Sequence, residues 1–427
     1  MLFPVTYRVN GVGHMEVGGC DLVELAHEHG TPLYVYDEAT IRQRASEYVA
    51  AMASAGQVLY SAKAFASPQF LHVVAEQGLG LDVVSAGELH LALKSGFPQD
   101  RIHFLGNNKS REDLEAAYEA GATIVIDGDY EFEVLREVVP QGKRTPVMLR
   151  LSPGVKPDTH EHISTGQLDS KFGFSIESGA ARRAVDQALQ HPRLELVGLH
   201  SHIGSQIFAL SAYEHAMNIM LDLLVQLRDD LNFEPKKLGA GGGLGIAYTR
   251  DDDPPTPRHF VEVVQHALVT GCALRGLKVP QLVVEPGRSI AGPAGMALYT
   301  VGSIKDIPGV RRYVAVDGGM GDNIRPKLYG ARYEAYLASD PDRAPDGTVT
   351  IAGKYCESTD ILITDIEMPK LKTGDVIALP AAGAYCLAMA SNYNGMPRPE
   401  VLMVLDGEAR VMRRRETLDD LVAAEVF

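Results

Sequence analysis

A lysine with the potential for covalent chemistry stands at the end of a short apolar run. Lys63 closes the run VLYSAKA. A partly desolvated lysine amine has a lowered pKa, so it can attack an aldehyde and form a Schiff base. Alternatively, Lys63 simply extends its aliphatic stem along the protein and leaves its ammonium in water. Lys63 alone does not decide between these interpretations.

Two histidines, His200 and His202, occur in the stretch GLHSHIGSQ. Their spacing places both on one face of a strand. They are candidates for hydrogen-bonded strand residues or for metal ligands. No third ligand stands at a spacing typical of zinc sites, so we expect no metal. A histidine ring at this position equally suits stacking against a planar cofactor.

Glycines follow several of the same apolar runs. Gly241, Gly242 and Gly243 are consecutive, and Gly287 lies in EPGR. Glycine lets backbone N–H groups approach a phosphate closely, although a glycine triplet can also be only a flexible turn. Ser205, after a neighbouring run, favours the phosphate interpretation.

Glu285 ends the apolar run LVVE, and Arg288 follows three residues later. A carboxylate at the end of an apolar strand is costly unless it is paired. One possible partner is Arg288, in a structural ion pair. The other is the protonated nitrogen of a pyridine cofactor, whose ring would then stay cationic and accept an electron pair.

Polar residues recur in the last part of the chain. Cys356 and Glu357 lie in GKYCESTD, and Tyr385 lies in the Gly-rich stretch AAGAYC. A lone cysteine is more often a small buried residue, but these polar neighbours indicate partial exposure.

Eight apolar runs alternate with stretches that carry apolar residues at helical spacing. The runs are QVLYSAKA, LGLDVVS, RIHFLG, ATIVID, PVMLRLSP, LELVGLHSHIGS, KKLGAGGG and QLVVEPGR. About eight strand–helix units close a (β/α)8 TIM barrel of roughly 250 residues, and catalytic groups gather at the carboxyl ends of its strands. An open, doubly wound sheet is the competing fold.

After about residue 290 the pattern changes to strands separated by Gly, Pro and Asp turns, with few helices. We therefore predict a fold of class α/β plus β with three regions. Residues 1–33 form short strands that pack on the β domain, residues 34–290 form the barrel, and residues 291–427 form a β-sandwich or β-barrel domain.

Composition limits the function. The net charge of -15 argues against a nucleic-acid-binding surface. Four cysteines without a CxxC pair indicate a reducing compartment. The N-terminus lacks the pattern of a signal peptide, and no stretch of about 18 residues is apolar throughout. We expect a cytoplasmic protein with no membrane and no nucleic-acid partner.

These motifs occur in a fixed order over nearly the whole chain: YSAKA, GLDVVSAGEL, HSHIGSQ, GAGGGLGI, EPGRS, the CES segment and GAY. The ordered set resembles the alanine-racemase-like (fold-type III) pyridoxal-phosphate decarboxylases. The stretches at 159–174, 323–331 and 391–399 resemble the diaminopimelate decarboxylases rather than the ornithine or arginine enzymes.

The resemblance implies roles for the cofactor site. Lys63 would bind the aldehyde of pyridoxal 5'-phosphate covalently, His202 would stack on the ring, and Glu285 would pair with the ring nitrogen. Small and hydroxyl-bearing residues would surround the phosphate: Ser205, Gly241, Gly242, Gly243, Gly287 and Tyr385. Arg288 would lie near both cofactor and substrate. One departure is Cys386, where the family usually has a smaller residue; we expect it to pack near the phosphate.

The resemblance also implies how an amino-acid substrate is bound and converted. Five residues would contact the substrate: Arg288, Arg325, Tyr329, Glu357 and Tyr385. Cys356 would donate a proton after carbon dioxide leaves. Cys356 and Glu357 would enter the active site of the other protomer, so the expected functional unit is a homodimer with shared active sites.

The expected reaction is decarboxylation of meso-2,6-diaminopimelate to L-lysine, the last step of lysine biosynthesis. Two arginines can grip the distal carboxylate, and an ornithine enzyme would leave them unmatched. Decarboxylases for ornithine, arginine or carboxynorspermidine are the nearest alternatives, followed by a racemase. A cofactor carrier would lack the C-terminal β domain, and a catalytically dead binder is disfavoured by the intact Lys63 and Cys356.

Overall fold

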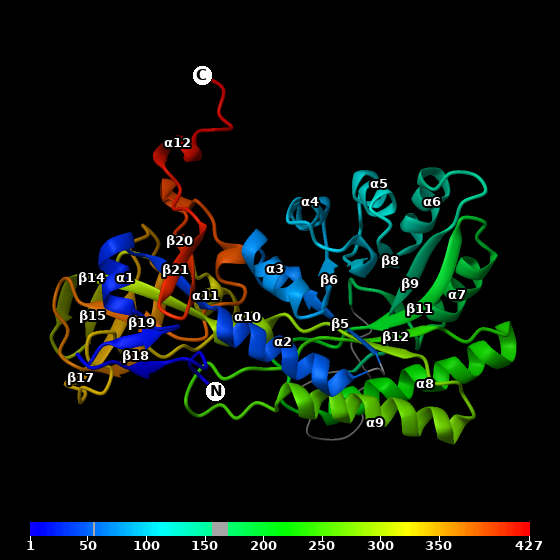
Figure 1. The fold of residues 1–427 in the computed structure, drawn as a ribbon, viewed down its shortest axis with the longest axis horizontal. Coiled ribbons are helices and arrows are strands. Elements are labelled where there is room, and N and C mark those ends of the chain that lie inside the picture. Colours follow the sequence, from blue (N-terminus) through cyan, green and yellow to red (C-terminus); the bar gives the residue numbers. More distant parts are fainter. Residues whose placement is uncertain (54–55, 156–169) are drawn as a thin grey trace. The chain divides into compact units, whose positions relative to one another are not determined.

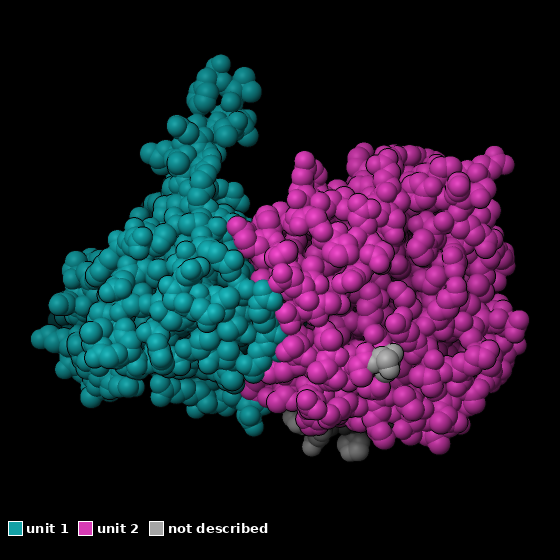
Figure 2. All heavy atoms as spheres, in the orientation of Figure 1, with its two compact units in different colours: residues 1–43, 246–253, 288–427 teal, residues 44–245, 254–287 magenta. Residues whose placement is uncertain are grey.

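The computed structural model describes residues 1–53, 56–155 and 170–427. The chain divides into two compact units, which Figure 2 shows in different colours. Unit 1 comprises residues 1–43, 246–253 and 288–427, and unit 2 comprises residues 44–245 and 254–287. Each unit has its own principal sheet.

Unit 2 is a closed barrel of eight parallel strands. The strands are β5 (Gly56–Ser61), β6 (Gly80–Val83), β7 (Ile102–Phe104), β8 (Thr123–Ile126), β9 (Thr145–Ser152), β11 (Leu194–Ser201), β12 (Lys237–Gly241) and β13 (Gln281–Val284). They pair in the order β9-β11-β12-β13-β5-β6-β7-β8, and pairing of β8 with β9 closes the ring. The predicted (β/α)8 barrel is therefore confirmed, because an open sheet would leave β8 and β9 as edges. A short strand, β10 (Phe174–Ser175), adds to β9.

Helices follow most of the barrel strands and lie outside them (Figure 1). They are α3 (Pro68–Glu76), α4 (Ala86–Lys94), α5 (Arg111–Glu119), α6 (Asp129–Val138), α7 (Ala180–Gln190), α8 (Ser211–Leu231) and α9 (Pro257–Arg275), preceded by α2 (Glu38–Met52). Serine side chains cap the N-termini of three of these helices. Ser67 caps α3 by accepting from Phe70 N, Ser85 caps α4, and Ser110 caps α5 in a capping box with Asp113. Such caps satisfy N–H groups that a helix start leaves unpaired, so they fix where each strand-to-helix turn ends.

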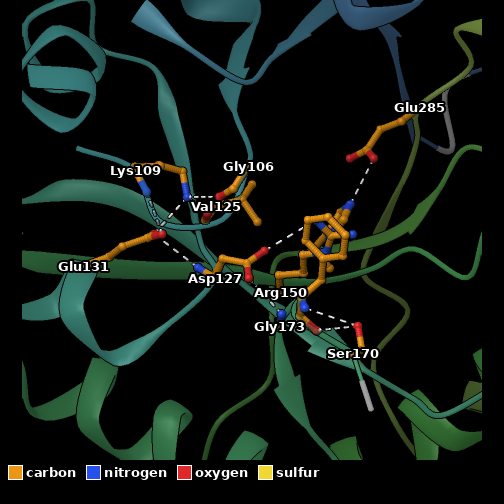
Figure 3. Close-up of polar contacts among 11 residues, drawn as sticks. Gly106, Lys109, Val125, Asp127, Glu131, Arg150, Ser170, Gly173 and Glu285 are labelled. Atoms are coloured by element: carbon orange, nitrogen blue, oxygen red, sulfur yellow. Dashed lines mark hydrogen bonds and ion pairs between the residues drawn. The ribbon is translucent and has the colours of Figure 1, made fainter. Parts of the chain in front are cut away.

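A buried ion pair lies inside this α/β unit (Figure 3). Lys109 Nζ donates to Glu131 Oε2 at 2.8 Å and to the carbonyl oxygens of Gly106 and Val125 at 2.6 Å each. Both charged side chains are 1% exposed. Glu131 also accepts from the backbone N of Asp127 at 3.1 Å, so the pair ties the turn after β8 to the turn after β7.

Unit 1 is built mainly of sheet. Its strands pair in the order β18-β17-β15-β14-β4-β20-β21, and β19 joins β14 to β16. Their bounds are β4 (Leu33–Asp37), β14 (Gly295–Ile307), β15 (Arg311–Val316), β16 (Tyr336–Leu337), β17 (Gly347–Ala352), β18 (Ile361–Met368), β19 (Val376–Leu379), β20 (Glu400–Leu405) and β21 (Glu408–Arg413). The predicted C-terminal β domain is confirmed in this sheet.

Strand β4 differs from the sequence-based expectation. All of its residues except Leu33 lie inside the range predicted for the barrel, yet it pairs with β14 and β20. All five of its residues are buried because it is a central strand of the unit 1 sheet.

The first residues form a three-stranded sheet of β1 (Arg8–Val9), β2 (Met15–Val17) and β3 (Cys20–Asp21), followed by α1 (Leu22–His29). This small sheet contacts later parts of unit 1, since Met15 N donates to Ala338 O at 2.8 Å and Gly407 N donates to Gly18 O at 2.7 Å. Short helices complete the unit: α10 (Arg288–Ala294), α11 (Arg325–Tyr329) and α12 (Leu418–Leu421). Within the described ranges, no helix combines the length and the apolar character needed to cross a membrane.

The buried pair generates a stability prediction. Glu131→Gln leaves the Lys109 ammonium buried without its carboxylate, and we expect a loss of about 3–5 kcal/mol in the free energy of unfolding. Urea unfolding measures this loss. The matched control is Glu137→Gln on the same helix, whose exposed pair with Arg111 contributes about 0–1 kcal/mol. Equal effects of the two substitutions would contradict the assigned role of the buried pair.

Candidate active site

The barrel residues predicted to hold a cofactor come from neighbouring strand ends. His202 follows β11, Gly241 ends β12, Glu285 follows β13, and Lys63 lies in the 3-10 turn Ala62–Ala64 directly after β5. Strands β11, β12, β13 and β5 are consecutive neighbours in the barrel. The structure thus brings these side chains together on one rim, at the carboxyl ends of the strands. The Lys63 side chain is exposed there.

Glu285 is held by a buried hydrogen bond to His200. His200 Nε2 lies 2.9 Å from Glu285 Oε2, and both side chains are at most 4% exposed. Burial alone would raise the pKa of Glu285, but His200, His202 and Lys63 together outweigh burial, so the pKa is lowered. The sequence left the partner of Glu285 open, and His200 supplies a barrel partner that keeps the carboxylate ionised.

His202 is a neutral ring at the rim. Desolvation, together with the nearby cations of Lys63 and Arg150, lowers the pKa of His202 to about 3. Its Nδ1 accepts a hydrogen bond from the backbone N of Gly242 at 3.3 Å. An acceptor Nδ1 means that the proton of the neutral ring sits on Nε2.

The glycines of the rim are required by close approach. A Cβ on Gly241 would lie 2.7 Å from His202 Nδ1, and one on Gly242 would lie 2.0 Å from Glu285 O. A Cβ on Gly287 would lie 2.9 Å from Ser61 Cβ. The absence of side chains therefore lets the ends of β12, β13 and β5 approach each other. Glycine backbone of this kind also allows a phosphate to approach closely.

Asp82, at β6, is a site residue that the sequence reasoning missed. It is buried beside the turn that carries Lys63, and its Oδ2 accepts from Ser61 Oγ at 2.7 Å. Burial and the nearby Glu285 raise the pKa of Asp82, whereas Lys63 lowers it. The available signal was a carboxylate inside the apolar run LGLDVVS, the same signal that singled out Glu285.

Arg150, on β9, is a second residue near the site that was not singled out from the sequence. Its Nη1 lies 3.4 Å from Asp127 Oδ2, and its guanidinium lies 4.2 Å from the centre of the Phe172 ring. Asp127 also accepts from the backbone N of Gly173 at 2.8 Å (Figure 3). The stretch at 159–174 resembles the diaminopimelate decarboxylases. Its residues 159–169 lie outside the described part of the structure.

Unit 1 places the predicted arginines among tyrosines. Arg325 is buried, donates from Nη1 to the Tyr333 hydroxyl at 2.5 Å, and lies 4.5 Å from the centre of the Tyr248 ring. Arg288 donates to the Tyr248 hydroxyl and lies 4.7 Å from the centre of the Tyr385 ring. No carboxylate pairs with Arg325 among the residues that the structure describes. Its charge therefore stays available for an anionic ligand.

The remaining predicted residues of unit 1 differ in exposure. Tyr329, at the end of α11, is 63% exposed, whereas Tyr385 is partly buried with a left-handed φ of 61°. A non-glycine residue in that region marks a constrained turn. Cys386 is buried, its Sγ lies 3.5 Å from the Tyr333 hydroxyl, and burial raises its pKa to about 11.

Cys356 and Glu357 stand together on the segment between β17 and β18. Cys356 is the one exposed cysteine of the four. Its backbone N donates to Asn394 Oδ1 at 2.8 Å. Glu357 accepts from the backbone and hydroxyl of Thr359, each at 3.2 Å, and these bonds lower the pKa of its carboxyl.

The barrel rim suits a flat, cationic ring with an aldehyde and a phosphate. It offers an amine at Lys63, an ionised carboxylate at Glu285, a neutral ring at His202 and bare glycine backbone. Pyridoxal phosphate has such a ring, an aldehyde and a phosphate. The described part of the chain contains no cluster of His, Cys, Asp and Glu that would hold a metal.

Comparison with known proteins agrees with this chemistry. The model of a family described as pyridoxal-dependent decarboxylase, pyridoxal binding domain, matches residues 38–292. The diaminopimelate decarboxylase of Bacillus subtilis is 49% identical over 99% of this chain and 97% of its own length. That of Halalkalibacterium halodurans is 47% identical over 100% of this chain and 98% of its own length.

Solved structures give the same result. The diaminopimelate decarboxylase of M. jannaschii in complex with L-lysine has a TM-score of 0.92 at 34% identity, covering 100% of this chain and 99% of that chain. The lysine/ornithine decarboxylase of Vibrio vulnificus, at 22% identity and a TM-score of 0.75, shares the fold over 90% of this chain and 97% of its own.

The chain therefore belongs to the fold-type III pyridoxal-dependent decarboxylases. Within that class it belongs to the diaminopimelate decarboxylase family, and it is a carboxy-lyase that uses pyridoxal phosphate.

The depressed pKa of His202 generates a prediction. The ring should remain neutral at all pH values above about 5, because its protonated form is desolvated and faces two cations. NMR of the ring protons, assigned with the variant His202→Gln, should show no titration of His202 between about pH 5 and 8. A titration midpoint above about 5 would contradict the combined effect of desolvation and the two cations on this ring.

Proposed function

We propose that this chain decarboxylates meso-2,6-diaminopimelate to L-lysine and carbon dioxide, the last step of lysine biosynthesis, with Lys63 as the residue that binds the cofactor. The observation that carries the proposal is the position of Lys63 on a rim shared with the buried Glu285–His200 pair. The high identity to diaminopimelate decarboxylases over the full chain supports the choice of substrate.

The barrel residues would hold and tune the cofactor. Bound pyridoxal phosphate supplies a ring that accepts the electron pair left on the α-carbon when the carboxylate departs. Glu285, ionised and backed by His200, would face the ring nitrogen and favour its protonated form. His202 would lie against the ring. The phosphate would be bound by Ser205, Gly241, Gly242, Gly243, Gly287 and Tyr385, with Arg288 close by.

Substrate recognition would depend on the arginines of unit 1. Diaminopimelate carries a second amino-acid end, and its carboxylate matches a guanidinium fork. Arg325 is suited to this role because Tyr333 and Tyr248 hold it without neutralising its charge. Arg288, Tyr329 and Tyr385 would add contacts to the carboxylates, and Glu357 would pair with the distal ammonium.

The last chemical step is proton delivery to the α-carbon. We assign it to the thiol of Cys356, whose exposure in the single chain suits a group that acts on a bound substrate. Cys356 and Glu357 of one protomer would enter the active site of the other, so the functional unit would be a homodimer. A cytoplasmic location is supported by the scarcity of cysteine.

Lys63→Ala should abolish the visible absorbance of bound cofactor and the release of carbon dioxide, because no other amine would take the aldehyde. Absorbance spectra after gel filtration measure the first effect. The matched control is Lys94→Ala, an exposed lysine at the end of α4. Retention of both the absorbance band and the activity in Lys63→Ala would refute the assignment.

Arg325→Ala should raise the KM for meso-diaminopimelate by about 10- to 150-fold, since a hydrogen bond to a charged group contributes about 1.5–3 kcal/mol. The cofactor absorbance should stay unchanged. Arg343→Ala, which removes an exposed arginine of the same unit, serves as the control. An unchanged KM in Arg325→Ala would exclude Arg325 from the substrate site.

A further inference from the structure

The segment that carries Cys356 and Glu357 is anchored by one buried carboxylate. We call residues 353–360 the cysteine loop. Asp360, 3% exposed, ends this loop and accepts the backbone N–H of Tyr355 on Oδ2 at 2.9 Å. Its other oxygen, Oδ1, accepts the backbone N–H of Met320 at 2.7 Å. One side chain therefore joins the cysteine loop to a second segment of unit 1.

That second segment, residues 318–322, leads directly toward Arg325 and is itself fixed to the core. Asp322 Oδ2 accepts from the hydroxyls of Tyr299 on β14 at 2.5 Å and Tyr34 on β4 at 3.0 Å. Asp322 Oδ1 accepts from Gly319 N at 2.9 Å. A further bond runs from Lys354 N to Gly318 O at 3.1 Å. The anchor of the cysteine loop is thus attached to the central strands of the sheet.

Two glycines lie in close contact with the Asp360 carboxylate. A Cβ on Gly319 would lie 2.5 Å from Asp360 Oδ1, and a Cβ on Gly353 would lie 2.2 Å from Oδ2. Gly319 has a φ of 152°, which also favours glycine. Both neighbours of the carboxylate must therefore be glycine for the two segments to meet.

Asn394, 38 residues after Cys356 in the chain, also holds the loop. Its Oδ1 accepts the backbone N–H of Cys356 itself at 2.8 Å. Asn394 has a left-handed backbone, with φ 56° and ψ 20°, a conformation that asparagine tolerates better than most residues. The adjacent Tyr393 stacks on Tyr355, with ring centres 6.2 Å apart and planes at 16°. Ser391 N donates to Gly321 O at 2.8 Å, which connects this turn to the 318–322 segment as well.

We propose that Asp360 and Asn394 are positioning residues for the reaction: they fix the backbone of Cys356 and Glu357, the two residues that would enter the active site of the other protomer. This proposal rests on the proposed function of Cys356. Both residues act on backbone N–H groups, so the thiol keeps its proton and its freedom to reach the α-carbon. A proton donor that is already held in place loses less entropy on reaching the transition state, so the activation free energy is lower. Displacement of such a group by about 1 Å can lower the rate about 100-fold.

The first test compares two variants of Asn394 in the full-length holoenzyme. Asn394→Gly keeps the left-handed backbone conformation accessible but removes the oxygen that accepts the Cys356 N–H. Asn394→Asp keeps both the backbone conformation and an acceptor oxygen. We expect Asn394→Gly to lower kcat about 5- to 10-fold, the equivalent of about 1 kcal/mol for one hydrogen bond, with little change in KM. Exchange of the Cys356 amide hydrogen should become faster by a similar factor. Asn394→Asp should restore both values.

Asn232→Gly is the matched control. Asn232 is an exposed, left-handed asparagine at the end of α8 in unit 2, and its substitution should change neither kcat nor exchange in the cysteine loop. Asp360→Asn, which keeps one acceptor oxygen, should lower kcat at least as much as Asn394→Gly. It should also accelerate amide exchange at Tyr355. Circular dichroism verifies that each variant is folded.

The outcomes separate the two proposals. If Cys356→Ala is inactive while Asn394→Gly and Asp360→Asn keep the wild-type kcat and amide exchange, the positioning role is overturned and the proposed function stands. If Cys356→Ala is fully active, the donor role fails, and the positioning proposal fails with it. A loss of kcat together with faster exchange at Cys356 and Tyr355, reversed in Asn394→Asp, supports the positioning role.

Discussion

A carboxylate buried among apolar strands stays charged only if a fixed partner replaces its lost hydration. In this barrel the carboxylate is Glu285 and the partner is His200, 2.9 Å away on a strand two positions along the ring. The strand between them, β12, must lack side chains near its carboxyl end so that His200 and Glu285 can reach each other across it. That condition explains why Gly239, Gly241 and Gly242 all contact His200, His202 or Glu285 so closely that no Cβ would fit. The carboxylate proposed to face the cofactor ring and the glycines proposed to lie near the phosphate therefore depend on the same packing at the end of β12.

A comparable arrangement recurs in unit 1, with the sign of the charge reversed. Arg325 is buried, and the oxygen nearest to it belongs to a tyrosine hydroxyl rather than a carboxylate. The guanidinium is held over the Tyr248 ring while its positive charge persists. The barrel therefore contains a buried negative charge at Glu285, and unit 1 contains a buried positive charge at Arg325.

The barrel could be predicted from the sequence because its signals are local. Each strand is a short, continuous apolar run, and each is followed by a helical pattern, so all eight strands of the ring were placed. Strands β4, β10, β16, β18 and β20 were not predicted. Strand β4 has the same apolar pattern as a barrel strand, and only its pairing with β14 and β20 assigns it to unit 1. These pairings join residues more than 200 positions apart in the chain, so no local sequence pattern can predict them.

The same limit applies to the candidate site. Residues that stand at strand ends in recognisable motifs, such as Lys63 and Glu285, could be named from the sequence. Their partners could not, because Asp82, Tyr248 and Tyr333 matter through contacts that the fold alone creates. The role proposed for Asp360 likewise depends on a hydrogen bond to Met320, 40 residues away.

The central claim is that the rim of the barrel binds pyridoxal phosphate through Lys63 and that the arginines of unit 1 select a substrate with a distal carboxylate. The most direct measurement is incubation of the purified protein and pyridoxal phosphate with meso-diaminopimelate, L-ornithine or L-arginine, with carbon dioxide and the amine product quantified. The account predicts equal amounts of L-lysine and carbon dioxide from meso-diaminopimelate and little release from the other two. Faster release from ornithine or arginine, or none from meso-diaminopimelate, would contradict it.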